Sequence, residues 1–475
     1  MQERRIWISI LILGILFQIL AAIFMPLGLD AHVHATYVSD GISDGDPTLD
    51  WGKLRIDGAN QSIAEEIPAD EKWLIWHSIL EIWFGIFGIS LLSLHILSLI
   101  ISFSSLAVVF FSTKSLWGEN NALALTAILS IYSPLVRSTG RLYQESLVLM
   151  LATIVIFAII RIIRRENHKF WHLTCLLCLA VILSLKGLPV KYSLYLYLPI
   201  LSLELYKPRY KPISIPILII LTTLISIILV WYRIGEITID IALILPVTIF
   251  ISGIIYLYIG GLLFSSNSTK SNSESDLLML ISQIIFAGLC GYIVMLLLVE
   301  MNTLETTRDV VQDRFRYIYR YVTVLVVPLW WSQMAKDKSC GIQLKENKHR
   351  SLMTLAIALM LIINSYILTF DRGIEELGEE MSIEIEDDQN ILYIADPPLS
   401  MHRLYTLQIT IDPHHDRNIT AYWANEDKNW SNIIDENNID WVIFSDESIN
   451  YLDEDWILFE TNTDHEVYYL PTKMD

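Results

Sequence analysis

An aspartate and two histidines alternate in the segment GLDAHVH, directly after the first apolar stretch of the chain. In extended backbone, Asp30, His32 and His34 would share one face, because successive side chains of a strand point to opposite sides. A carboxylate beside two imidazoles can bind a divalent metal or perform acid–base chemistry. Two interpretations of Asp30 stay open: a catalytic base, or a residue that caps an interfacial helix.

A second group of charged residues recurs every four positions in RSTGRLYQE. Arg137, Arg141 and Glu145 would therefore line one face of a helix. Such a face is either a structural ladder of ion pairs at a helix end or part of a functional site, and the spacing alone favours neither interpretation.

Cations also gather near two later apolar stretches, in TTRDVVQDRFRYIYRY and in SLKGLPVKY. Charge at membrane depth is costly and usually marks a function or a partner. Arginine matches phosphate well, because its guanidinium presents a planar fork of donors. The alternative is that these side chains snorkel to lipid headgroups. The residues concerned are Arg308, Arg314, Arg316, Arg320, Lys186 and Lys191.

The elements that must position these residues are membrane spans. The chain of 475 residues is 53% hydrophobic, with a mean hydropathy of +0.46. This composition excludes a disordered chain and an ordinary soluble enzyme. A span needs about 20 mostly apolar residues. We predict about eleven spans, at 6–27, 85–111, 121–136, 146–163, 170–185, 192–206, 213–231, 241–264, 277–299, 319–334 and 351–370, with an interfacial helix over 73–84.

The charge of −19 is distributed very unevenly. Residues 1–370 carry 28 Lys and Arg against 26 Asp and Glu, whereas residues 371–475 carry 5 against 26. We therefore predict a membrane domain over 1–370, with its first outer loop at 28–72, and an acidic soluble domain over 371–475. The negative balance argues against a nucleic-acid partner.

Five apolar runs of strand length in residues 371–475 predict a small α/β domain there: ILYIADPP, NITAYWAN, WVIFSDE, WILFETN and EVYYLP. Its Asp412, His414, His415 and Asp416 suit metal binding or simple surface solvation, and we favour solvation. Lysine and arginine predominate in the loops on the side of the N-terminus. This bias places the N-terminus in the cytoplasm and the acidic domain outside, in a multi-pass protein of the cell membrane.

The layout resembles the GT-C class of integral-membrane glycosyltransferases, such as protein O-mannosyltransferases and aminoarabinose transferases. The resemblance rests on the span number, on Asp30 after the first span, on Glu145 at the start of the fourth, and on the soluble domain after the last. It departs from the class in one motif: many members have Asp-Glu or Asp-x-Asp in the first loop, and this chain has Asp30-Ala31-His32.

The resemblance implies an inverting transferase that moves a sugar from a polyprenyl-phosphate or polyprenyl-diphosphate carrier to a protein, lipid or glycan acceptor. Asp30 would be the base, and Glu145 would orient the acceptor or a metal. His32, His34, Arg137, Arg141, Lys186, Lys191, Arg314, Arg316 and Arg320 would bind substrate or phosphate. A divalent metal, Mg²⁺ or Mn²⁺, on Asp30, His32 and His34 stays an open alternative. Two other functions stay open: a transporter or flippase of an anionic lipid-linked substrate, and a non-catalytic relative.

Overall fold

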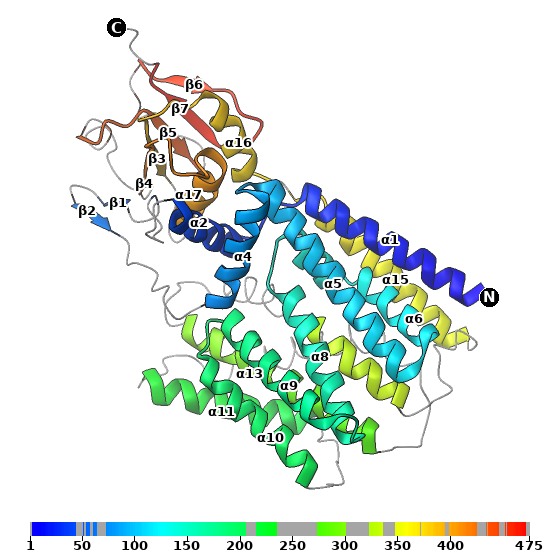
Figure 1. Cartoon of the computed structure of the whole chain (residues 1–475). Helices are drawn as coiled ribbons and strands as arrows, with labels where there is room; N and C mark the ends of the chain where they lie inside the picture. Colours follow the sequence, from blue (N-terminus) through cyan, green and yellow to red (C-terminus); the bar gives the residue numbers. More distant parts are fainter. Residues whose placement is uncertain are drawn as a thin grey trace.

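The computed structural model describes residues 2–43, 51, 54–57, 60–63, 73–205, 215–234, 273–300, 323–335, 347–370, 372–394, 399–424, 434, 436–445, 452 and 454–471. Within them a helical bundle carries a smaller domain built on a sheet at one end (Figure 1). The bundle and the helices joining it to the sheet are α1 (Gln2–Phe24), α2 (Leu29–Ser43), α4 (Leu74–Phe87), α5 (Leu91–Trp117), α6 (Glu119–Ser130), α7 (Ser133–Gly140), α8 (Glu145–Ile163), α9 (His168–Leu185), η1 (Val190–Tyr192), α10 (Ser193–Leu205), α11 (Ile215–Ile234), α13 (Ser273–Glu300), a helix over 323–335, and α15 (Asn347–Ile367).

Each predicted span except 241–264, which lies outside the described residues, overlaps one of these helices. Three helices of the described part, α1, α5 and α8, are long and apolar enough to cross a membrane; the pair α6–α7, bent by 59°, makes a fourth if it is one span. The fold is thus mostly helical, with several helices of membrane character, and the number of eleven spans is not confirmed.

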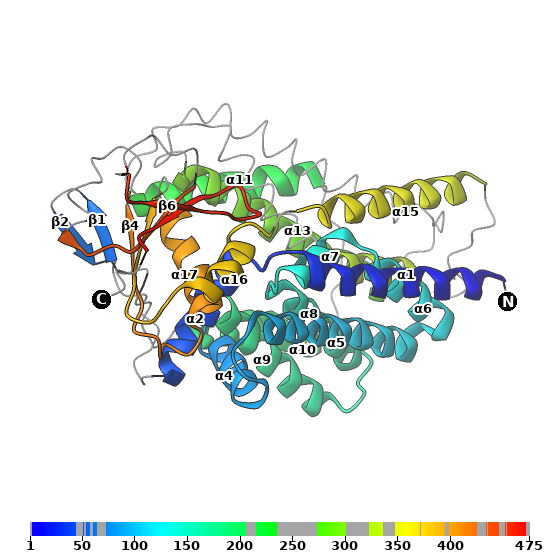
Figure 2. The same cartoon turned by 90° about the horizontal axis from the view of Figure 1, so that it is seen from above.

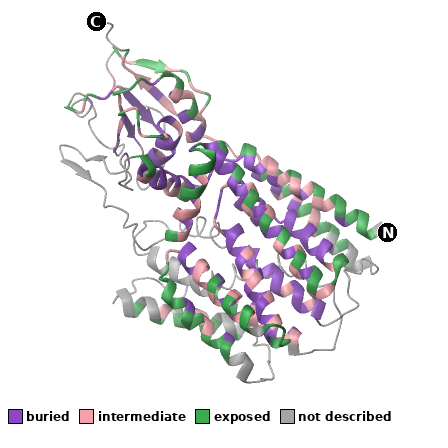
Figure 3. Cartoon of the chain, in the orientation of Figure 1, coloured by how far each residue is buried: buried purple, intermediate pink, exposed green. Residues whose placement is uncertain are grey.

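Large apolar side chains cover the outside of the bundle. Figure 3 shows exposed residues along the outer helices. Among them, Ile12 on α1 is 62% exposed, Phe111 on α5 is 66% exposed, and Ile362 on α15 is 66% exposed. A soluble protein would bury such a surface to remove it from water, whereas contact with apolar lipid tails costs no free energy. The exposed faces therefore fit a bilayer around the bundle.

The helix of the second predicted span, 85–111, begins at Leu91, because a helix break at residues 88–90 precedes it. Gly88 has φ of +78° and ends α4. Ser90 then caps α5, since its hydroxyl accepts a hydrogen bond from the Ser93 amide at 3.2 Å. The predicted interfacial helix is therefore a separate element, α4. Its 14 residues are too short to cross a bilayer.

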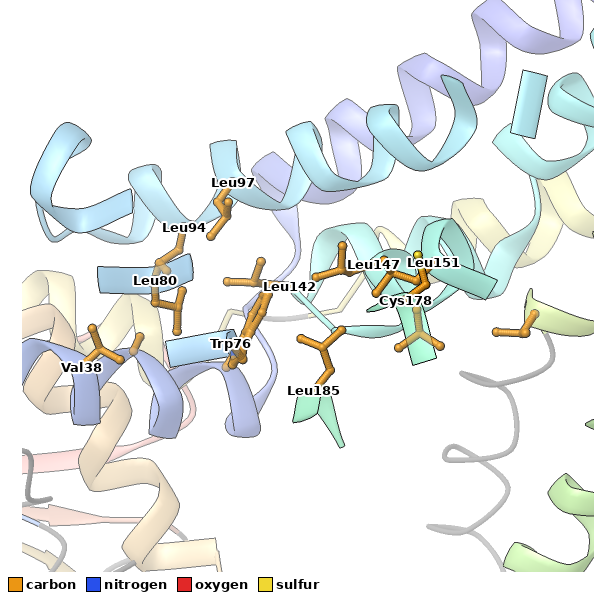
Figure 4. Packing of buried hydrophobic residues seen from close by; sticks show 14 of the residues in the cluster. Val38, Trp76, Leu80, Leu94, Leu97, Leu142, Leu147, Leu151, Cys178 and Leu185 are labelled. Atoms are coloured by element: carbon orange, nitrogen blue, oxygen red, sulfur yellow. The ribbon is translucent and has the colours of Figure 1, made fainter. Parts of the chain in front are cut away.

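Inside the bundle, α4, α5, α8 and α9 share one apolar core. Trp76 of α4, Leu94 of α5 and Leu151 of α8 lie in it, together with Leu185 at the end of α9 (Figure 4). Trp76 is 1% exposed, so it packs in this core. The core packs α4 with α8 and α9. Two predicted site residues lie at the ends of these helices: Glu145 begins α8, and Lys186 follows α9.

A buried polar network ties α1 to α5, α6 and α7. Gln18 of α1 donates to the Ser130 carbonyl at 3.0 Å and accepts from the Ser102 hydroxyl at 2.7 Å. Thr139 of α7 donates to the same Ser102 hydroxyl at 2.9 Å. Polar groups with no water nearby need such partners. The network therefore holds the bend between α6 and α7 in place.

The second domain is a seven-stranded sheet in the order β2-β1-β4-β3-β5-β7-β6. The central strands β3, β4 and β5 are parallel, and β6 and β7 extend one edge as an antiparallel pair. The elements are β1 (Leu54–Asp57), β2 (Asn60–Ile63), α16 (Ile374–Glu384), β3 (Asn390–Ile394), α17 (Leu399–Ile411), β4 (Thr420–Ala424), β5 (Trp441–Phe444), β6 (Ile457–Phe459) and β7 (Glu466–Tyr469). Each of the five predicted apolar runs contains a strand.

The other edge of the sheet is formed by β1 and β2, which belong to the predicted first outer loop at 28–72. The hairpin β1–β2 joins the rest of the sheet through Arg55 of β1, which pairs with Trp423 of β4 in parallel register. The Trp51 indole donates to the Ile419 carbonyl at 3.0 Å and is 3% exposed within the core of the sheet domain. Helix α2 also lies against α17 (Figure 2). The sheet domain thus contains chain from both sides of the predicted border at residue 370.

The prediction of surface solvation in this domain is correct for His414 and Asp416, which are exposed. It is wrong for Asp412, which is 3% exposed, and for His415. His415 Nε2 lies 2.5 Å from Asp40 Oδ1, and Asp40 on α2 is buried. The partner of His415 is Asp40, more than 370 positions earlier in the chain. The residues next to His415 in the sequence therefore do not indicate this contact.

We expect Gly14→Ala to destabilise the bundle. A Cβ at Gly14 would lie 2.0 Å from Ser130 Oγ and 2.6 Å from the Ser130 carbonyl carbon, so α1 and α6 must separate. Overpacking of this kind costs about 1–3 kcal/mol. The measurement is the melting temperature in detergent. The matched control is Gly288→Ala on α13, where a Cβ meets nothing within 4 Å. Equal melting temperatures for the two variants would contradict the close contact.

Candidate active site

Asp30 lies in the first turn of α2, six residues after Phe24, where the membrane helix α1 ends; a link of four residues separates the two helices. The Gly28 carbonyl opens the helix by accepting from the amides of Ala31 at 2.8 Å and His32 at 3.1 Å. A carboxylate is favourable in a first turn, because the helix dipole is positive there. Asp30 is exposed, so its carboxylate is accessible at the bundle end nearest the sheet domain.

Asp30, His32 and His34 do not lie in extended backbone, in which they would share one face; they lie in the first part of helix α2. Residues two apart on a helix lie about 200° apart, whereas Asp30 and His34, four apart, share a face. His32 points to Glu375 and His34 to His77. The structure thus does not bring the three candidate metal ligands together, and no group of three metal-binding side chains occurs among the described residues.

The link before α2 is bound to the connection between α7 and α8. The Gly28 amide donates to the Arg141 carbonyl at 3.0 Å. A Cβ at Gly28 would lie 2.3 Å from the Tyr143 ring, so only glycine allows this approach. The contact brings Asp30 to the segment that carries Arg141 and Glu145.

The predicted continuous helical face through Arg137, Arg141 and Glu145 is wrong. Helix α7 ends at Gly140, Leu142 has φ of +49°, and α8 begins at Glu145. Arg137 and Arg141 nevertheless stay together, since both guanidinium groups lie over the Phe370 ring, at 6.0 and 5.6 Å from its centre. The Arg141 Nε is buried and makes no hydrogen bond within the described residues.

Glu145 and Lys186 form an ion pair, with Nζ 2.9 Å from Oε1. The Glu145 side chain is 4% exposed and that of Lys186 is 23% exposed. Lys186 follows α9, and the next residue, Gly187, has φ of +65° and packs against the Trp73 indole. We call Asp30, Arg137, Arg141, Glu145 and Lys186 the charged cluster.

Beside the charged cluster lies an imidazole pair, His34 and His77. Their Nδ1 and Nε2 atoms are 3.0 Å apart, so one ring nitrogen donates to the other. Trp73 and Tyr37 complete the ring cluster, at 5.2 Å from the His34 ring and 4.7 Å from the His77 ring. Burial, then the charges of His77 and Lys186, lower the pKa of His34 to about 3, and burial lowers the pKa of His77 to about 4. Both rings are therefore neutral at pH 7.

Sequence reasoning missed His77 and Trp73 as neighbours of the site. They lie in KWLIWHS, whose aromatic residues indicate an interfacial helix. That interpretation drew no attention to His77 as a titratable side chain. Lys191 lies on η1, exposed, with its ammonium 5.9 Å from the Tyr192 ring centre. Arg308, Arg314, Arg316 and Arg320 lie outside the described residues.

No protein-family model and no curated protein sequence matches the chain. Two solved structures of ArnT from Cupriavidus metallidurans are similar to it. The one bound to undecaprenyl phosphate has a TM-score of 0.43 and 11% identity, over 98% of each chain. The one in the apo state has a TM-score of 0.41 and 9% identity, over 97% of each chain.

Both TM-scores are below 0.5, so the roles of individual residues rest on the contacts within this chain.

We expect Lys186→Met to destabilise the protein more than Glu145→Gln. The first change leaves a carboxylate that is 4% exposed without the ammonium that neutralises it, whereas the second leaves an ammonium that can reach water. Loss of one partner from a buried pair costs about 3 kcal/mol. Melting temperatures of both single variants and the double variant test this. Additive effects, with no coupling between the two sites, would contradict the pairing.

We expect stability to fall on acidification because of the imidazole pair. The pKa of each histidine in the folded protein lies below its ordinary value of 6.5, so the unfolded chain binds more protons between about pH 6.5 and 3. Stability is therefore fully present above pH 6.5 and is lost as the pH falls. The loss due to His34 is on the order of 2 kcal/mol at pH 5. Melting temperatures from pH 7.5 to 5 measure it, and His34→Gln with His77→Gln should flatten the profile.

Proposed function

We propose that this protein is a membrane glycosyltransferase. It moves a sugar from a polyprenyl-phosphate or polyprenyl-diphosphate carrier to an acceptor outside the cytoplasm, with the charged cluster and the sheet domain on the outer side. One observation carries the proposal: Asp30, an exposed residue, lies two positions after Gly28, whose amide binds the Arg141 carbonyl in the connection between Arg137 of α7 and Glu145 of the Glu145–Lys186 pair.

Asp30 suits the role of the base. Its carboxylate takes the proton of an acceptor hydroxyl, whose oxygen forms a bond to the anomeric carbon of the sugar. The bond from that carbon to the phosphate oxygen breaks at the same time, and its electron pair leaves on the phosphate. Attack from the face opposite the phosphate inverts the anomeric centre.

Arg137, Arg141 and Lys186 suit the role of phosphate ligands. The negative charge that develops on the departing phosphate is stabilised by cations already in place. The Arg141 Nε supports this role, since it is a buried donor without a hydrogen bond in the described part of the protein, and unsatisfied buried donors are rare. Glu145 keeps Lys186 in position and orients the acceptor. The alternative of a divalent metal on Asp30, His32 and His34 would require His32 to leave Glu375 and His34 to leave His77.

Asp30→Asn tests the proposal. In purified protein given a polyprenyl-phosphate sugar, transfer should fall by about 10²–10⁴-fold, the usual contribution of a general base. The matched control is Asp464→Asn on the exposed surface of the sheet domain, which should transfer at the wild-type rate.

Unchanged transfer in Asp30→Asn would remove Asp30 as the base. Movement of labelled lipid across liposomes, with no sugar transfer by the wild-type protein, would favour the transporter or flippase instead.

A further inference from the structure

A buried glutamate of the sheet domain contacts the chain on both sides of Asp30. Glu375, in the first turn of α16, accepts hydrogen bonds at one oxygen from two distant groups. The Leu27 amide donates to Oε1 at 2.6 Å, and His32 Nε2 donates to the same atom at 2.8 Å. Leu27 lies three residues before Asp30, and His32 lies two residues after it.

These are strong contacts, because the carboxylate is charged and dry. The Glu375 side chain is 0% exposed and that of His32 is 2% exposed. Burial acts to raise the pKa of Glu375, but the hydrogen bond from His32, the charges of His32 and His95, and the Leu27 amide outweigh it, so that the pKa is lowered. Charge-assisted hydrogen bonds are about twice as strong as neutral ones.

The second oxygen of Glu375 faces an arginine of the same helix region but makes no hydrogen bond within the described residues. Arg372 Nε lies 3.6 Å from Oε2, and the same guanidinium donates to both oxygens of Glu379, at 2.8 and 3.1 Å. Oε2 thus has only the nearby positive charge of Arg372, and the hydrogen bonds of the Glu375 carboxylate are the two that Oε1 accepts from Leu27 and His32.

The link is thus fixed from two directions. Glu375 binds the Leu27 amide, and the next amide, that of Gly28, donates to Arg141 in the bundle. The first turn of α2, which contains Asp30, is thus bound to both the bundle and the sheet domain.

We propose that Glu375 is a positioning residue, which sets the place of Asp30 by binding Leu27 and His32 and so makes the reaction depend on the docking of the sheet domain. This inference rests on the proposed function of Asp30. Glu375 touches no reacting atom, so its loss affects the geometry of the transfer step more than the binding of the donor.

Three variants separate the reach of the side chain from its charge. Glu375→Gln keeps an oxygen that can accept both hydrogen bonds but loses the charge. Glu375→Asp keeps the charge but is one methylene shorter, and Glu375→Ala removes the acceptor. The matched control is Glu384→Ala, which removes an exposed carboxylate at the C-terminal end of the same helix α16.

In the transfer assay with a polyprenyl-phosphate sugar, we expect kcat of Glu375→Ala to fall about 10²-fold, as a displacement of about 1 Å can cause. KM should change little. Glu375→Asp should also lose kcat, whereas Glu375→Gln should keep most of it and the control all of it. A large rise of KM with unchanged kcat, or a greater loss in Glu375→Gln than in Glu375→Asp, would overturn positioning by these bonds.

Hydrogen exchange of the peptide over residues 25–34 gives a measurement that does not depend on activity. The Leu27 amide should lose protection in Glu375→Ala and Glu375→Asp, and keep it in Glu375→Gln and Glu384→Ala. Unchanged exchange in Glu375→Ala would overturn the inference even where Asp30→Asn abolishes transfer. Faster exchange together with full transfer by Asp30→Asn would instead overturn the proposed function, and with it the positioning role.

Discussion

The four-residue link between α1 and α2 is the constraint on which the rest of the site depends. It connects the end of α1 at Phe24 to the start of α2 at Leu29 with only four residues. Two adjacent amides, of Leu27 and Gly28, are bound by separate parts of the molecule. Because backbone donors in a buried link need partners, the fold satisfies them with the groups that also locate Asp30.

The charged cluster is assembled from helix ends and the connections between helices. Asp30 begins α2, Arg141 follows α7, Glu145 begins α8 and Lys186 follows α9. Each of these ends lies toward the sheet domain, while the middle of the bundle is filled by apolar side chains and the network around Gln18. Ionic groups at helix ends escape the cost of charge in the hydrocarbon region. This placement suits chemistry at the membrane surface on a substrate anchored in lipid.

Much of the architecture could be predicted from the sequence, because hydropathy and strand-length apolar runs are strong local signals. Helices lie at the predicted spans within the described residues, and β3 to β7 lie in the predicted runs. Local patterns also selected Asp30, Arg141, Glu145 and Lys186. They failed where contacts join distant segments. The periodicity of GLDAHVH cannot show that His32 faces Glu375, and four-residue spacing cannot show that the chain turns at Leu142.

The sheet domain has a consequence for the order of events during synthesis. Trp51 binds the carbonyl of Ile419, 368 residues later in the chain, and β1 has no neighbour but β2 until β4 exists. At about 5–20 residues per second, the ribosome needs roughly 20–70 s to reach that partner. During this time the helices from α4 to α15 are made, while the hairpin β1–β2 has an open strand edge. The protein therefore completes its sheet only after its bundle, and its biogenesis must protect that edge from pairing with other chains.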